Sequence, residues 1–276
     1  MEKIYFQNGN VTIENINNFD IAQTLDCGQA FRWQKSDNNK WCGIAYGRYL
    51  EIQQQNNTVT LFNTTEDDFN NIWRKYFDLD RDYGKIIKNI SGNDVLKSAA
   101  EYGKGIRVLR QEPWEALCSF IISQNNNIPR IKGIVDRLCE NFGEKINGGY
   151  TFPTAETISR LTLDDLLVLR SGFRAKYILD AAKKVADGTI DFTLLDKLTT
   201  DKAREKLMQI YGVGAKVADC AMLYGMGKLD AFPKDVWIKR ALEVLFNGNL
   251  PEEDAKNAGI IQQYIFFYAR ETKLDI

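Results

Sequence analysis

Two residues in the C-terminal half of the sequence could carry out chemistry together, Lys216 and Asp235. Lys216 follows a glycine-rich link and lies in the first turn of a predicted helix, where the helix dipole favours the neutral amine over the cation. Asp235 lies near the start of a further predicted helix, a position that suits a carboxylate. Both residues also have a structural alternative, since Asp235 could only cap its helix and Lys216 could be a solvated cation. Because the chain contains no histidine, acid–base chemistry falls to lysine or carboxylates.

The link before Lys216 has the form of a helix-hairpin-helix motif. Two amphipathic segments flank residues 211–214 (YGVG), which are too few for anything but a tight turn. Gly212 and Gly214 allow positive φ and close approach of another molecule, and the next helix begins with exposed backbone N–H groups. This arrangement could bind a phosphate without reading a base sequence. An ordinary corner between two helices is the alternative.

The composition describes a folded globular chain without a strong overall charge. Hydrophobic residues make up 44% of the 276 residues and the formal net charge is −1, so no global field indicates a polyanionic partner. Basic side chains are in excess between residues 101 and 240, whereas both ends of the chain are acidic. A local basic surface in the central segment is therefore possible.

The five cysteines are scattered and include no C-x-x-C pair. Neither a structural zinc site nor an iron–sulfur cluster has a suitable ligand set, so we expect no metal and no cofactor. The odd number of cysteines suits a reducing compartment. The N-terminus lacks an apolar signal core, and no run of about 18 apolar residues occurs. We expect a cytoplasmic protein, associated with the nucleoid if bacterial, with no membrane partner.

The hydrophobic period changes once along the chain. Up to about residue 75, aromatic and β-branched residues alternate with polar ones, which predicts an antiparallel meander with strands at 30–33, 41–45, 49–53 and 58–62. From residue 66 onward a period of about 3.6 predicts helices at 65–76, 113–123, 128–142, 163–169, 175–187, 201–210, 215–225, 233–245 and 258–272. Pro113, Pro129 and Pro251 fall at helix starts.

These elements predict an α+β fold of two domains. We expect an N-terminal antiparallel β-sheet domain at residues 1–85, packed on a mainly α-helical domain at residues 86–276 that contains the helix-hairpin-helix motif. The sequence shows no internal repeat and no flexible linker, so the boundary between the domains should be a packed one.

The segment around Lys216 resembles the 8-oxoguanine DNA glycosylase/lyase branch of the helix-hairpin-helix glycosylase superfamily. The resemblance begins with residues 211–220 (YGVGAKVADC) and 233–236 (PKDV) and extends, in the expected order, from about residue 14 to the end. The further matching segments are 27–33 (CGQAFRW), 75–80 (KYFDLD), 107–113 (RVLRQEP), 123–130 (SQNNNIPR), 172–177 (GFRAKY) and 258–266 (AGIIQQYIF).

The resemblance implies a lysine nucleophile that forms a Schiff base. Lys216 would attack C1′ of a damaged nucleoside, displace the base and allow β-elimination, chemistry that an amine can support and water cannot. Asp235 would stabilise the positive charge that builds on the sugar. Such a protein is expected to excise 8-oxoguanine from duplex DNA, preferably opposite cytosine, and then to cleave the strand.

The resemblance also implies a pocket for a base flipped out of the duplex. Gly28 would offer its backbone carbonyl to the N7–H group that 8-oxoguanine has and guanine lacks. Gln262 would bind the Watson–Crick edge, and Phe266 and Cys220 would stack on the two faces of the base. Phe266 could otherwise be a core aromatic residue, and the choice of Gln262 over Gln263 rests on helical register alone.

Four further residues are implied to contact the DNA around the flipped nucleotide. Asn125 would fill the gap, although a turn or helix cap is its alternative, and Phe173 would act as a wedge. Arg130 and Arg174 would contact the estranged cytosine, or else serve as phosphate clamps or surface charges. The chain departs from the family at Trp237, where relatives carry a phosphate-contacting histidine that Lys234 or Lys239 could replace, and at Phe173, where tyrosine is usual.

Three other functions compete with this hypothesis. A helix-hairpin-helix DNA-binding module without catalysis would not need Lys216, Asp235 and the pocket residues together. An endonuclease III type glycosylase for oxidised pyrimidines often carries a four-cysteine cluster, which this chain lacks. An alkyl-base glycosylase would keep the aspartate and usually lack the lysine. We expect a monomer whose partner is double-stranded DNA containing 8-oxoguanine.

Overall fold

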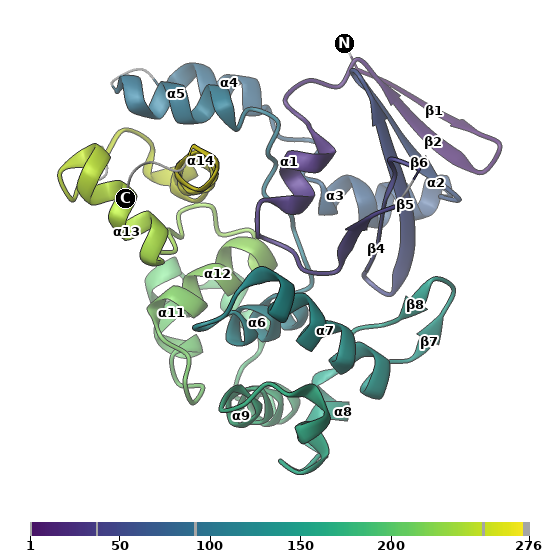
Figure 1. Ribbon diagram of the computed structural model, residues 1–276, viewed down its shortest axis with the longest axis vertical. Helices are drawn as coiled ribbons and strands as arrows, with labels where there is room; N and C mark the ends of the chain where they lie inside the picture. Colours follow the sequence, from purple (N-terminus) through teal and green to yellow (C-terminus); the bar gives the residue numbers. More distant parts are fainter. Residues whose placement is uncertain (1, 37, 91–92, 250–251, 273–276) are drawn as a thin grey trace. The chain divides into compact units, whose positions relative to one another are not determined.

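The computed structural model describes residues 2–36, 38–90, 93–249 and 252–272 (Figure 1). The chain forms two compact units that are interleaved along the sequence. The first unit comprises residues 1–29, 52–110 and 228–276, and the second comprises residues 30–51 and 111–227. The expected domain boundary at residue 85 stays a prediction.

An antiparallel sheet confirms the predicted β region. In the described part of the chain it has six strands in the order β1-β2-β6-β5-β4-β3. Their bounds are β1 Lys3–Gln7, β2 Asn10–Glu14, β3 Trp33–Lys35, β4 Trp41–Ala45, β5 Arg48–Gln55 and β6 Thr58–Phe62. Alternate residues are buried in β2, β5 and β6; in β2, Val11 and Ile13 face Leu61 and Val59 of β6. The sheet therefore has the two-residue side-chain period on which the prediction rested.

Two details of the sheet differ from the predicted strands. The expected strand at 30–33 is wrong in its bounds, because β3 begins only at Trp33. The hairpin of β1 and β2 lies outside the four expected strands, although its turn residues Asn8 and Gly9, both with positive φ, form the Asn-Gly pair that favours a two-residue hairpin. The Asn8-Gly9 dipeptide is thus the feature of the sequence that could have predicted this hairpin.

The first unit carries helices from both ends of the sequence. They are α1 Ile21–Asp26, α2 Glu66–Asp68, the π-helix η1 Phe69–Trp73, α3 Arg74–Tyr76, α4 Tyr83–Asn89, α5 Asp94–Tyr102, α13 Val236–Phe246, the 3₁₀ helix η3 Glu252–Asn257 and α14 Ala258–Glu271. Helix α14 packs against both α5 and α13 (Figure 1). The expected helix at 65–76 is thus interrupted by a π-helical turn, and the one expected at 233–245 begins after Asp235. Pro251 lies outside the described residues.

The second unit is mainly helical. Its elements are α6 Pro113–Ile122, α7 Ile128–Phe142, β7 Lys145–Ile146, β8 Gly149–Tyr150, α8 Ala155–Ser159, the 3₁₀ helix η2 Asp165–Leu169, α9 Arg174–Ala186, α10 Phe192–Lys197, α11 Thr200–Leu207 and α12 Ala215–Met226. The expected helix at 163–169 is therefore a 3₁₀ turn, and Arg170 in the left-handed region ends it. Pro113 and Pro129 lie in the first turns of α6 and α7, as predicted.

Helices α6 and α12 form the centre of the second unit (Figure 1). Gly225 allows their close approach, since a Cβ atom there would lie 2.9 Å from Cα of Pro113. Most residues of both helices are buried, so the side chains at the start of α12 are placed by rigid packing.

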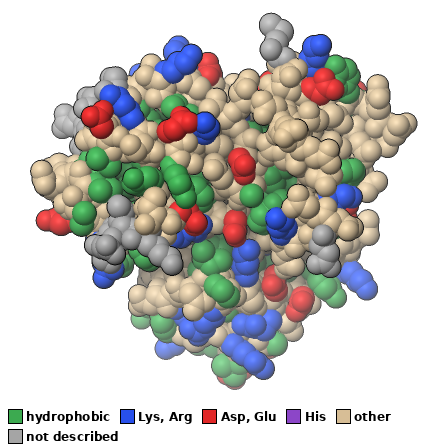
Figure 2. Space-filling model, turned by 45° about the horizontal axis from the view of Figure 1, so that its top comes forward, with side chains coloured by type: hydrophobic (Ala, Val, Ile, Leu, Met, Phe, Trp, Pro, Cys, Tyr) green, Lys and Arg blue, Asp and Glu red, His purple; other side chains and the backbone are tan. Residues whose placement is uncertain are grey.

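In the described ranges, no helix is both long enough and apolar enough to span a membrane. Figure 2 shows one face of the molecule, on which acidic and basic side chains are mixed over much of the surface and Lys and Arg gather at the lower end. The near-neutral net charge therefore hides an uneven distribution of charge.

Candidate active site

The helix-hairpin-helix motif consists of α11, a turn and α12. Gly212 in the turn has a φ of 78°, and a Cβ atom there would lie 2.5 Å from the ring of Tyr177. Both the backbone conformation and the packing therefore require glycine at this position. Gly214 is the N-cap residue of α12, is exposed and has open space around its Cα.

Polar contacts hold the hairpin to the neighbouring helix α9. The backbone N–H of Tyr211 donates to Asp180 Oδ2 at 2.7 Å, and Lys184 Nζ donates to the carbonyl of Gln209 at 2.7 Å. The first turn of α12 leaves backbone N–H groups without intrahelical partners. An exposed, glycine-lined helix start of this kind can accept an anion.

Lys216 is the second residue of α12 and is half-buried. Its Nζ donates a hydrogen bond to Ser123 Oγ at 3.2 Å and lies 5.3 Å from the centre of the Phe120 ring. Phe120 is buried and stacks on Tyr224 of α12, with ring centroids 5.1 Å apart. The amine is therefore held over the C-terminal end of α6 instead of extending into solvent.

Cys220 lies one turn after Lys216 and is buried. Residues four positions apart share a helix face, so the thiol lies on the same face as the lysine. The neighbouring Asp219 points to α11, where Arg204 Nε donates to its Oδ1 at 2.6 Å. This ion pair joins the two helices of the motif.

The run Asn125-Asn126-Asn127 divides into three different roles. Asn127 is the N-cap of α7 and accepts from the N–H of Arg130 at 3.0 Å, while Asn126 Nδ2 donates to the carbonyl of Ile122. Asn125 is exposed and adopts a left-handed conformation with a φ of 47°. Its side chain forms no hydrogen bond within the described ranges. Capping, the alternative considered for Asn125, belongs to Asn127.

Arg174 is almost fully buried, with 2% of its surface exposed. Its guanidinium donates to the carbonyls of Gln124, Asn125 and Ser171, with distances of 2.8 Å to Asn125 and 3.1 Å to Ser171. Burial, and then the nearby Arg130 charge, lower the pKa of Arg174. In this structure Arg174 therefore fixes the loop that presents Asn125, and it would have to leave these carbonyls before it could contact a base.

The other two residues expected at the DNA are exposed. Arg130 lies on the surface of the first turn of α7. Phe173 is 47% exposed and its ring covers the Arg174 guanidinium at 4.5 Å. Phe173 also packs edge-on against Tyr177, which in turn contacts Tyr211 of the hairpin. A row of aromatic side chains thus leads from the expected wedge to the hairpin turn.

In the first unit, Gly28 follows α1 with a φ of 89°. The adjacent side chain of Gln29 is fully buried, donates to the carbonyls of Thr24 and Arg107 at 2.8 Å, and accepts from the N–H of Leu109. Glycine is favoured here because other residues rarely adopt this φ. The Gly28 backbone is therefore held in one position by its neighbour.

Helix α14 anchors the same loop. Gln263 Nε2 donates to the carbonyl of Cys27 at 3.4 Å, and Arg270 donates to the carbonyl of Asp26 at 3.0 Å. Gln262 and the half-buried Phe266 each lie one residue before Gln263 and its helix neighbour Phe267, and their spacing of four residues places them on one helix face. The assignment of Gln262 to the base stays a prediction.

Asp235 is the N-cap of α13, and its Oδ1 accepts from the N–H of Ile238 at 2.8 Å. The capping role considered for this residue is therefore present. Asp235, Gly28, Gln262 and Phe266 belong to the first unit, whereas Lys216, Cys220, Asn125, Arg130, Phe173, Arg174, Gly212 and Gly214 belong to the second.

Two family descriptions together match nearly the whole chain. Residues 11–117 match "8-oxoguanine DNA glycosylase, N-terminal domain", and residues 118–258 match "HhH-GPD superfamily base excision DNA repair protein". The chain belongs to the 8-oxoguanine glycosylase branch of the HhH-GPD superfamily. Membership of this family confirms the resemblance on which the site prediction rested.

Relatives of this HhH-GPD protein include enzymes with solved structures. It is 35% identical to the N-glycosylase/DNA lyase of Saccharomyces cerevisiae over 253 residues, which cover 80% of this chain and 66% of the yeast protein. MBOgg1, solved with a low-affinity DNA ligand, is 41% identical with a TM-score of 0.93. The Clostridium acetobutylicum 8-oxoguanine glycosylase/lyase, solved with DNA containing cytosine opposite 8-oxoG, is 37% identical with a TM-score of 0.91. Each of the two structures aligns over 99% of both chains.

The chain spans about two thirds of the length of the curated relatives it matches, with coverage of 66%, 68% and 64% for three of them.

Ser123 contacts Lys216 in this HhH-GPD protein, but the sequence did not indicate Ser123 as a site residue. Residues 123–130 resemble a family segment, but no feature of that segment indicates a contact between Ser123 and a lysine 93 positions away. Gln29 was likewise recognised only as part of residues 27–33, and its buried position follows from packing. Neither residue carries a local signal that could have identified its role.

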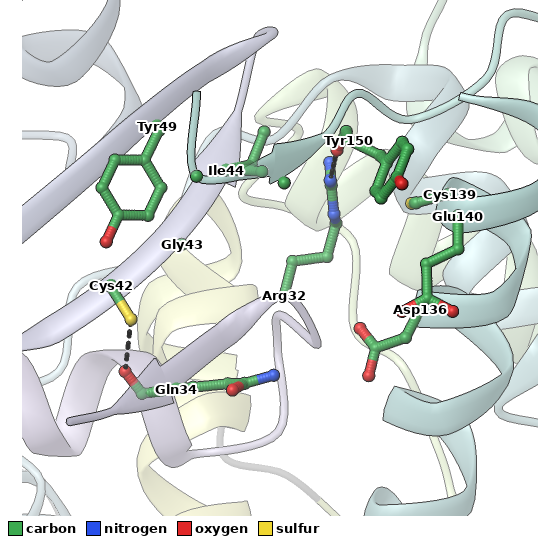
Figure 3. A pocket seen from close by; sticks show the side chains of 12 residues that line it. Arg32, Gln34, Cys42, Gly43, Ile44, Tyr49, Asp136, Cys139, Glu140 and Tyr150 are labelled. Atoms are coloured by element: carbon green, nitrogen blue, oxygen red, sulfur yellow. Dashed lines mark hydrogen bonds between the residues drawn. The ribbon is translucent and has the colours of Figure 1, made fainter. Parts of the chain in front are cut away.

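A cavity of about 170 Å³ lies in the second unit among β3, β4, α7 and β8, and none of its lining residues is a predicted site residue. Figure 3 shows Arg32 directed at the carbonyl of Tyr150, with Asp136 and Glu140 of α7 beside it. Arg32 also pairs with the buried Glu115 at 3.3 Å, and burial raises the pKa of Glu115 to about 7 despite the opposing effect of the Arg32 charge. The cavity is therefore lined by one member, Arg32, of a buried ion pair.

Proposed function

We propose that the protein is a bifunctional DNA repair glycosylase that excises 8-oxoguanine from duplex DNA and then cleaves the strand. Family membership supports this function, as do the names of the yeast and Clostridium relatives. The observation that carries the mechanism is the half-buried amine of Lys216 at the first turn of α12, directly after a glycine hairpin suited to a phosphate.

The proposed reaction begins with the neutral amine of Lys216. Its lone pair attacks C1′ of the flipped nucleotide, the C1′–N9 bond breaks, and the base leaves with the electron pair and takes up a proton. The nitrogen then loses its extra proton as the C1′–O4′ bond opens, which forms the Schiff base and leaves a hydroxyl at C4′. Loss of a proton from C2′ breaks the bond between C3′ and its oxygen, and water finally releases the lysine.

The remaining pocket residues act on charge and on recognition of the base. Asp235 stabilises the positive charge that develops on the sugar in the transition state, where its effect on rate is largest. The Gly28 carbonyl accepts from the N7–H of 8-oxoguanine, and guanine leaves this acceptor unpaired. Gln262 binds the Watson–Crick edge, and Phe266 and Cys220 contact the faces of the ring.

Cytosine is the proposed partner base. Arg130, Phe173 and Asn125 are exposed in the second unit and suit contacts around the gap, and Arg174 underlies the loop that presents Asn125. We expect faster excision opposite cytosine than opposite the other three bases. Equal single-turnover rates for all four opposing bases would exclude this preference.

The experiment that tests the proposed function is borohydride trapping on a duplex with one 8-oxoguanine opposite cytosine. The native protein should form a covalent adduct, and Lys216→Gln should form none and excise the base about a thousandfold more slowly. Lys228→Gln, which removes a lysine just after α12, is the control and should be trapped like the native protein. If the native protein binds the duplex without being trapped, a module without catalysis or a water-using glycosylase takes the place of this proposal.

A further inference from the structure

In the second unit, Ser123 at the C-terminal end of α6 is in contact with the Lys216 amine. Its Oγ accepts from Lys216 Nζ at 3.2 Å, and the same Oγ lies 2.8 Å from the carbonyl of Phe120. A carbonyl oxygen only accepts, so the single hydroxyl proton of Ser123 is donated to Phe120. The lone pairs of Ser123 Oγ therefore remain for an N–H group of the lysine.

This arrangement keeps the lysine lone pair directed away from Ser123. A neutral primary amine has two N–H groups and one lone pair, and a hydrogen bond donated to Ser123 uses one N–H group. The lone pair then lies away from Ser123 and is free to attack. We propose that Ser123 is a positioning residue for the nucleophile, because it fixes the amine by accepting its proton and never competes for its lone pair.

The end of α6 has backbone capping bonds that do not involve the hydroxyl of Ser123. The backbone N–H of Ser123 forms the C-terminal capping bonds, to the carbonyls of Ser119 and Ile121. The ring of Phe120 contacts the lysine from the same helix end but offers no directional acceptor. Removal of the hydroxyl should therefore keep these backbone bonds while it deletes the hydrogen bond to the Phe120 carbonyl and releases the amine.

The inference rests on the proposed function, and the test separates the two. Single-turnover excision, the duplex Kd and the yield of borohydride adduct are measured for native protein, Ser123→Ala and Ser123→Thr. We expect Ser123→Ala to lose about tenfold in excision rate at saturating protein with an unchanged Kd, since misplacement of a reacting group lowers the rate and not the binding. Ser123→Thr keeps the hydroxyl and should recover the rate to within about threefold.

Ser119→Ala is the matched control, because it removes a buried hydroxyl one turn earlier on the same helix. It should excise within about twofold of the native rate. Ser123→Cys fills the site of the hydroxyl with a thiol, which accepts hydrogen bonds only weakly. This variant replaces Ser123→Ala in the test if Ser123→Ala does not fold, and it should show the same loss of excision rate.

Four outcomes would overturn the positioning role. They are a native rate in Ser123→Ala and Ser123→Cys, an equal loss in Ser119→Ala, a loss confined to Kd, and no recovery in Ser123→Thr. If the native protein itself forms no adduct, the proposed function fails first. If the native protein is trapped and the Ser123 variants match it, only the positioning role fails.

Discussion

Lys216 in the second unit and the loop around Gly28 in the first unit are held in different ways. Within the described part of the chain, the lysine amine has one hydrogen bond, to Ser123 Oγ. The Gly28 loop is fixed by the fully buried Gln29 and by Gln263 and Arg270 of α14. An amine that acts as a nucleophile must move toward the carbon that it attacks. A carbonyl that distinguishes 8-oxoguanine from guanine by one N–H group must instead stay in place. The contrast in anchoring suits the two tasks that we propose for Lys216 and for the Gly28 carbonyl.

The largest effect on stability should come from the anchored loop. Gln29→Ala leaves the carbonyls of Thr24 and Arg107 and the N–H of Leu109 without this partner, so we expect a loss of about 3 kcal/mol in the free energy of unfolding. Urea unfolding measures it, with Gln34→Ala on the exposed edge strand as the control. A loss below about 1 kcal/mol would mean that the loop is not held as the comparison requires.

Asp235 tests whether a capping residue can also act on the reaction. Asn caps a helix as well as Asp does, so Asp235→Asn should change the free energy of unfolding by less than about 1 kcal/mol. Excision should fall about a hundredfold, because the charge that we propose to stabilise the sugar is lost. Asp191→Asn, at the cap of α10, makes the same change and should leave excision unaltered. Equal effects of the two substitutions on excision would show that Asp235 is only a cap.

The buried ion pair of the second unit should make its stability depend on pH. The folded-state pKa of Glu115 is about 7, above the ordinary value of 4.5, so its contribution is full below pH 4.5 and is lost as pH rises through 7. Glu115→Gln should therefore gain about 2 kcal/mol relative to native protein between pH 5 and pH 7. Urea unfolding at the two pH values measures the difference. A constant difference would place the pKa of Glu115 near its ordinary value.

The smallest effect should come from the long contact of α14 with the loop. Gln263→Ala removes the hydrogen bond to Cys27, which should cost about 1 kcal/mol of stability and relax the preference for 8-oxoguanine over guanine a few-fold. Gln262→Ala is the paired variant and should lower the excision rate instead. Excision rates on 8-oxoguanine and on guanine, measured for both variants, distinguish them. If Gln263→Ala lowers the excision rate and Gln262→Ala changes only the preference, the base contact belongs to Gln263.

Much of the fold follows from local patterns in the sequence. The alternation in β2 and β6, the 3.6-residue period of α7, and the tight turn at Gly212 are dictated by neighbouring residues. Asn127 as the cap of α7 is likewise a local hydrogen bond, although its place in a run of three asparagines concealed which one caps. The 3₁₀ turn at Asp165–Leu169 and the π-helical turn at Phe69–Trp73 escaped prediction, because a hydrophobic stripe does not distinguish closely related helices.

By itself, the sequence determined the family, the hairpin and the presence of a lysine at the start of a helix. It did not determine the register of the glutamines, because residues 258–265 of α14 are all buried and their periodicity marks no single face. Only the tertiary structure decided that Arg174 is buried under the Asn125 loop, that Gln263 contacts Cys27 and that Ser123 accepts from Lys216. These contacts join residues 49 to 236 positions apart. Their geometry depends on how helices pack, which no local pattern encodes.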